Sequence, residues 1–237
     1  PATAAVTTTR WRAFPLQPEL PPEGLPAGPF FEAKFGGPER VRAVRSRVVE
    51  AGATEGIAFA FERQARVFNT RLAHRIVALV QETRDATPVV EALFVANFEE
   101  GLDLGDRETL LGRLVAGGVI DDADAERLRA RLDAGEGEGA VDDDLRLAAA
   151  IEVTGVPFLI ANRRVALSGA QPEAVVRELL ARAVAPGPPA AYAGPVTADA
   201  APAPAARRPA GSRPFWTRAK LGHPLRDLFN SFGRRLS

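Results

Sequence analysis

The spacing of apolar residues divides the chain into a long helical stretch and flanking segments with strand character. Between residues 38 and 153, apolar side chains recur every three or four positions, which is the period of a helix with one buried face. A proline at the first helical position, or a side chain that can cap a helix, marks each start. The predicted helices begin at Pro38, Asn69, Thr87, Asp106, Asp122 and Val141.

Strand character precedes this helical stretch and interrupts it once. Residues 7–14 are rich in β-branched and aromatic side chains, which predicts a strand. The proline-rich residues 15–29 then predict an irregular loop. Residues 56–62 alternate between apolar and small or polar positions, so we expect a short extended segment after the first helix.

The period changes again after residue 153. Residues 158–160 are a short apolar run that predicts a strand, Asn162-Arg163 predicts a tight turn, and residues 164–167 predict a returning strand. An amphipathic helix is expected over residues 172–183. A β-hairpin and a helix after so much pure helix indicate a small α/β domain that carries a helical insertion, over about residues 38–153.

Composition changes once more at residue 186. Residues 186–214 are rich in proline and alanine and nearly free of large apolar side chains, which predicts a disordered linker after a domain of residues 1–185. Residues 215–237 regain apolar side chains at steps of three and four, which predicts a basic amphipathic helix. These apolar positions are Leu221, Leu225, Leu228, Phe229, Phe232 and Leu236.

The net charge of zero conceals an asymmetry between the body and the end of the chain. Residues 207–237 hold eight Arg or Lys and one Asp, a charge of +7, so residues 1–206 carry −7. An acidic body argues against a nucleic-acid-binding core, and no nucleic-acid partner is expected. An anionic partner would meet residues 215–237, either as an anionic membrane surface or as a protein groove.

Composition also excludes several kinds of chemistry within this chain. Cysteine is absent, which rules out disulfides, thiolate zinc sites and a thiol nucleophile. The two histidines, His74 and His223, cannot build a multi-histidine metal site, so no metal is expected. No run of eighteen apolar residues is present, and the first nine residues do not resemble a secretory signal.

The most informative short stretch is Thr154-Gly155-Val156-Pro157, which lies between a predicted helix and a predicted strand. Proline is accommodated at the first residue of a strand. An X-Pro bond adopts the cis form at a cost of only about 0.5–1 kcal/mol relative to trans. The residues alone therefore leave two readings open, a plain strand entry with a trans proline and a cis proline that shapes a binding loop.

Five segments of the chain, in order, resemble the FrnE-type branch of the DsbA family of thioredoxin-fold proteins. They cover residues 7–183, about three quarters of the chain. Related branches are the 2-hydroxychromene-2-carboxylate isomerases and the kappa-class glutathione transferases. The segments are Arg12–Pro18, Asn69–Arg75, Phe94–Asp106, Thr154–Phe158 and Ser168–Pro172.

The resemblance implies a cytoplasmic thiol–disulfide oxidoreductase that acts on a protein or small-molecule thiol or disulfide, without a cofactor. In this family the proline loop holds the substrate beside a cysteine at a helix N-terminus. The substrate-binding residues implied here are Thr154, Gly155, Val156, Pro157, Asn69, His74 and Gln171.

Three of these residues have a competing reading. Asn69 either lines the pocket or only caps a helix, and the cap is favoured. His74 is more readily a buried structural histidine than a base. Gln171 corresponds to a helix start that binds glutathione in the kappa-like branch, but Ser168-Gly169-Ala170-Gln171 lacks the Ser-Asp pair of that branch.

The chain departs from the family in one respect. Family members place a strand and a Cys-x-x-Cys helix ahead of the segment that Thr7 starts, and that block of roughly 30–40 residues is missing here. In the thioredoxin topology the missing strand lies between the strands predicted over residues 7–14 and 158–160. We therefore expect a thioredoxin-like fold without its first β-α unit, and an incomplete gene model is favoured over an evolved cysteine-free variant. The other hypotheses are a glutathione-dependent isomerase or transferase and a catalytically inactive binding module.

Overall fold

The computed structural model describes residues 8–185, which form mostly helix with two small antiparallel sheets. The helices are α1 (Ala27–Phe35), α2 (Pro38–Thr54), α3 (Arg71–Gln81), α4 (Thr87–Val95), α5 (Arg107–Ala116), α6 (Asp122–Asp133), α7 (Glu138–Ala150) and α8 (Glu173–Val184). Two short turns of helix, η2 (Phe61–Arg63) and η3 (Ala96–Glu100), lie between them. The strands are β1 (Leu25–Pro26), β2 (Arg66–Val67), β3 (Phe158–Ala161) and β4 (Val165–Ser168).

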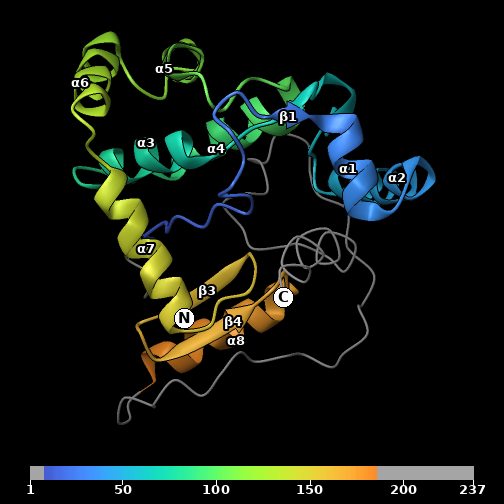
Figure 1. Cartoon of the computed structure of the whole chain (residues 1–237). Helices are drawn as coiled ribbons and strands as arrows, with labels where there is room; N and C mark the ends of the chain where they lie inside the picture. Colours follow the sequence, from blue (N-terminus) through green and yellow to red (C-terminus); the bar gives the residue numbers. More distant parts are fainter. Residues whose placement is uncertain (1–7, 186–237) are drawn as a thin grey trace.

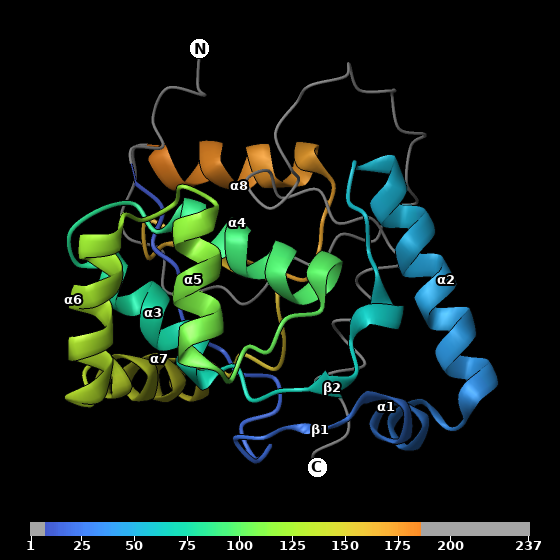
Figure 2. The same cartoon turned by 90° about the horizontal axis from the view of Figure 1, so that it is seen from above.

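The elements gather into a helical part and a smaller sheet part (Figure 1). Helices α3 to α6 lie together at one end, whereas the β3–β4 hairpin and α8 lie at the other. Helix α7 runs from the first part to the second, and its last turn leads into β3. Helices α1 and α2 stand to one side, where they pack on each other (Figure 2).

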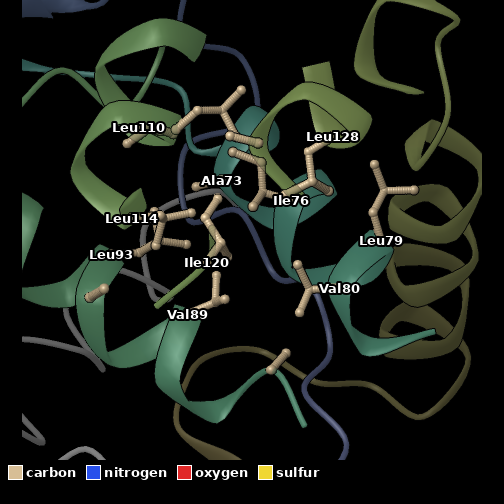
Figure 3. Packing of buried hydrophobic residues seen from close by; sticks show 14 of the residues in the cluster. Ala73, Ile76, Leu79, Val80, Val89, Leu93, Leu110, Leu114, Ile120 and Leu128 are labelled. Carbon is tan, nitrogen blue, oxygen red and sulfur yellow. The ribbon is translucent and has the colours of Figure 1, made fainter. Parts of the chain in front are cut away.

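The main hydrophobic core belongs to the helical part. The apolar faces of α3, α4, α5 and α6 converge on it, as Figure 3 shows. Its most deeply buried members include Ile76, Leu110 and Leu114, each with 0% of its surface exposed. Asp106 and Asp121 start α5 and α6, as their side chains accept hydrogen bonds from Thr109 N and Asp124 N. Both helices therefore begin where the sequence predicts.

The hairpin has the predicted strands, with a turn one residue longer. Residues 162–164 separate β3 from β4, and Arg164 N donates to the Ala161 carbonyl oxygen over 3.0 Å. Asn162 and Arg163 have φ values of 51° and 55°, the left-handed conformation that a tight hairpin turn requires. Helix α8 covers one face of the hairpin, where Leu167 and Leu179 are buried.

The strand predicted over residues 7–14 is wrong for its described part, since residues 8–14 have no regular structure. Side chains take the place of a neighbouring strand. Gln81 accepts from Trp11 N over 2.5 Å and donates to the Trp11 carbonyl oxygen over 3.1 Å. Asp144 accepts from Ala13 N over 2.7 Å. Because these helix-borne groups satisfy the backbone, β propensity alone does not produce a strand here.

Two other local predictions are corrected. The loop predicted over residues 15–29 contains β1 and the start of α1. Pro29 fits into α1 because the first turn of a helix does not need the proline N–H. The segment 56–62 is irregular and ends in η2 rather than in a strand, and Ala60 N donates to the Phe98 carbonyl oxygen.

Helix starts differ from prediction by up to three residues. Thr70, not Asn69, is the residue before α3, and α4 begins at Thr87 itself. Helix α7 starts at Glu138 instead of Val141, so Asp142 to Asp144 lie inside it rather than at its beginning. The predicted linker 186–214 and helix 215–237 lie outside the described residues.

Deleting a side chain at the centre of this core should lower the free energy of unfolding by a large amount. Ile76→Ala should lower the free energy of unfolding by about 2–5 kcal/mol, because it leaves a cavity among four helices. Val49→Ala, at a position 40% exposed on α2, should change it by less than about 0.5 kcal/mol. Urea unfolding followed by circular dichroism measures both, and equal effects would contradict this assignment of the core.

Candidate functional site

The segment 154–157 joins the end of α7 to β3. Thr154 is exposed, whereas Gly155, Val156 and Pro157 are half-buried. The Val156–Pro157 peptide bond is cis, which is one of the two conformations that the sequence leaves open. The Pro157 carbonyl oxygen accepts a hydrogen bond from Gly169 N over 2.8 Å, which continues the β3–β4 ladder by one step. The segment is therefore held on its β4 side.

The opposite edge of β3 has no strand beside it among residues 8–185, since β3 pairs with β4 alone. Backbone groups of successive residues in a strand point to opposite edges. Because Pro157 is bonded toward β4, the N–H and C=O groups of Phe158 and Ile160 point to the open edge. The Ile160 side chain is 45% exposed. The candidate site therefore borders an unfilled strand position.

Gln171 lies near the same segment but turns away from it. Its side chain is only 7% exposed, and its Nε2 donates to the Ser168 carbonyl oxygen over 3.2 Å. It thereby closes the turn between β4 and α8. Its amide supports the backbone next to Gly169, the partner of Pro157, so Gln171 contributes to the site through the turn.

Asn69 fastens the proline-rich segment to the start of α3. Its Nδ2 donates to the Pro18 and Leu20 carbonyl oxygens over 3.0 and 2.9 Å, and its Oδ1 accepts from Arg71 N over 2.9 Å. All of these partners are backbone groups of neighbouring segments. The favoured reading of Asn69 as the cap of this helix is corrected, because Thr70 takes the N-cap position and Asn69 precedes it.

His74 is a half-buried residue of α3 that faces the carboxylate of Asp144 on α7. Burial lowers the pKa of His74 to about 4, although the negative charge of Asp144 acts in the opposite direction. The imidazole is therefore neutral near pH 7. The same carboxylate binds the N-terminal segment, since Arg12 Nη1 donates to Asp144 Oδ1 over 2.6 Å.

The predicted site residues fall into two groups. Gln171 and residues 154–157 meet at the start of β3, as described above. Asn69 lies just before α3 and His74 lies on it. Arg71, at the start of α3, pairs with Glu138 and Asp142 in the first half of α7, whereas Thr154 follows the other end of that helix.

Comparison with known proteins places the domain in a family. A family model described as a DSBA-like thioredoxin domain matches residues 3–181. The chain belongs to the DSBA-like thioredoxin family. A crystal structure of a probable DsbA oxidoreductase from Streptomyces coelicolor matches with a TM-score of 0.63 and 26% sequence identity, over 82% of this chain and 83% of that one. No curated protein matches.

In this DsbA-like domain, sequence reasoning missed the residues that replace strand pairing. Gln81 and Asp144 bind the backbone of residues 11–13, but polar side chains on a helix ordinarily face water and carry no sign of such a partner. The sequence of β3 does carry a relevant signal. Its continuous apolar run indicates a strand buried on both faces, whereas the structure leaves Ile160 exposed.

Every helix that the structure describes is too short or too polar to cross a bilayer. A membrane contact of residues 215–237, which lie outside the described range, stays a prediction.

The low pKa of His74 predicts a loss of stability in acid. The unfolded chain takes up a proton near pH 6.5, whereas the folded chain does so only near pH 4. Between these values the unfolded state binds more protons, so the free energy of unfolding falls as the pH falls, by at most about 1.4 kcal/mol per pH unit. His74→Gln should flatten this dependence. Urea unfolding at pH 7, 6 and 5 tests it, and parallel pH profiles for both proteins would refute the assignment.

Proposed function

We propose that the chain is part of a FrnE-type thiol–disulfide oxidoreductase, whose redox cysteines belong to a strand–helix unit that precedes Thr7 and pairs with the open edge of β3. The observation that carries this proposal is β3 itself. Its sequence is apolar on both faces, yet among residues 8–185 one of its edges is unpaired and Ile160 is 45% exposed. A neighbouring strand would bond the Phe158 and Ile160 backbone groups, and the helix of the same unit, packed on that face of the sheet, would cover Ile160.

The segment 154–157 then forms the wall of the site that faces the substrate. Among residues 8–185, no hydrogen bond engages the backbone N–H or C=O of Val156. An extended substrate can pair with such groups as an added strand would. A cysteine at the start of the added helix would act as a low-pKa thiolate that attacks one sulfur of a substrate disulfide and releases the other as a thiolate.

The glutathione-dependent alternative finds less support. A carboxylate of glutathione would need a donor at the start of α8. Gln171 is the polar side chain there, and its amide is buried and bonded to the Ser168 carbonyl. The proposal therefore includes no cofactor. Because the FrnE-type resemblance implies a cytoplasmic protein, the proposal also includes a cytoplasmic location.

The DNA upstream of Pro1 tests the proposal directly. We expect an in-frame Cys-x-x-Cys pair, and the complete product should accelerate the reduction of insulin by dithiothreitol, whereas residues 1–237 should not. A serine in the place of the first cysteine would favour the glutathione-dependent reading. A start codon at this position would favour a cysteine-free binding module.

A substitution at Ile160 tests whether the proposed strand–helix unit packs beside β3 in the complete product. In residues 1–237, Ile160→Lys should change the free energy of unfolding by less than about 0.5 kcal/mol, because the side chain is exposed. In the complete product it should cost about 3 kcal/mol or more, because the helix of the added unit would bury the charge against that face of the sheet. Leu147→Lys, which is 40% exposed on α7, is the matched control and should be tolerated in both. Tolerance of Ile160→Lys in the complete product would contradict the pairing.

A further inference from the structure

A groove with an apolar floor runs between α5 and α6, which lie side by side at the far end of the helical part (Figure 1). It has a volume of about 380 Å³. Leu111, Gly112, Val115 and Ala116 of α5 and Ala125 of α6 line it. A Cβ atom built on Gly112 would meet no atom within 4 Å, so the groove is open above the middle of α5.

The rim of this groove is acidic. Glu108, Asp122 and Glu126 line it together with Arg129, which pairs with both glutamates, and Glu108 also pairs with Arg107 beside the groove. Hydrogen bonds from Arg129 and Arg107 lower the pKa of Glu108 to about 2, so this carboxylate is ionised at neutral pH. Within residues 8–185, Asp122 makes neither a salt bridge nor a side-chain hydrogen bond. The rim therefore keeps a net negative charge, with one acid that no cation of the described part neutralises.

The chain itself contains a segment with the complementary pattern. Residues 215–237 carry apolar side chains at helical spacing, and five Arg or Lys against one Asp. An amphipathic helix seats its apolar face in a groove of this kind and leaves its cations at the rim. Between α5 and α6 it would form the third helix of a small bundle.

The chain between α8 and residues 215–237 is long enough to permit a contact with the groove and short enough to favour it. Residues 186–214 provide 29 residues of proline- and alanine-rich chain after α8, which reach about 90 Å when extended at about 3.1 Å per residue. A tether of this kind holds its end at an effective concentration of the order of 1 mM. A shallow groove with millimolar affinity would therefore be substantially occupied.

We propose that residues 215–237 dock as a basic amphipathic helix into the acidic groove between α5 and α6. The contact is intramolecular, so the segment is withheld from other anionic surfaces while it is seated. High salt weakens it, because the rim charges are exposed and screened.

The absence of cysteine makes a sharp test available. A nitroxide attached to Ser231→Cys would be the only label on the chain, on the polar side of the predicted helix. We expect it to broaden the amide NMR signals of Gly112, Val115 and Ala125, and to leave those of α8 unchanged. The broadening should persist when labelled chains are diluted with unlabelled ones, and it should fall at about 0.5 M salt.

Two variants examine the groove itself. Gly112→Leu places an apolar side chain in the groove at a position where a Cβ meets no atom within 4 Å, and it favours helix, so we expect the fold to be kept while the broadening is lost. Gly139→Leu, at an equally open position on α7, is its control and should retain the broadening. Glu126→Lys should reduce the broadening about threefold or more. Asp143→Lys is the matched control, since Asp143 pairs with Arg146 as Glu126 pairs with Arg129.

Three results would overturn the proposal. Broadening that survives in Gly112→Leu would place the segment elsewhere, at the residues whose signals broaden. Broadening of an unlabelled, isotope-enriched chain by a separate labelled chain would assign the contact to a second copy. No broadening at all in the parent protein would mean that the segment does not dock.

Discussion

The need to pair backbone N–H and C=O groups governs this structure more than any single apolar contact. Residues 11–13 meet that need without a strand, since Gln81 and Asp144 supply the donors and acceptors. Within the described residues, strand β3 meets it on one edge only. The same constraint thus explains why a segment with strand propensity remains irregular, and why a strand next to the proline loop is left with an open side.

The helical part tolerates this gap because it has a core of its own. The large buried cluster draws on α3 to α6 and includes no residue of β3, β4 or α8. The hairpin relies instead on a small contact between Leu167 and α8, with Leu179 buried beneath it. The part that bears the candidate site, made of β3, β4 and α8, therefore buries fewer apolar side chains than the helical part. It is also the part in which one edge of β3 has no partner strand among residues 8–185.

Local sequence patterns predicted those elements that depend on residues close together in the chain. The cap at Asp106 and the Asn162-Arg163 turn were found because each depends on residues close in sequence. The irregular course of residues 8–14 depends on Asp144, about 130 positions away, so no local pattern reveals it. Within the candidate site, the proline loop was predictable from its position before an apolar run. The contacts of Asn69 with the Pro18 and Leu20 carbonyl oxygens were not, because they join segments about 50 positions apart in the chain.

Asp144 connects these observations, because it serves two neighbours at once. Its carboxylate holds Arg12 and Ala13, and it also faces the neutral imidazole of His74. A proton on His74 would add a cation that competes with Arg12 for the same oxygens in a half-buried place. The low pKa of His74 therefore favours the arrangement in which Asp144 is committed to the N-terminal segment.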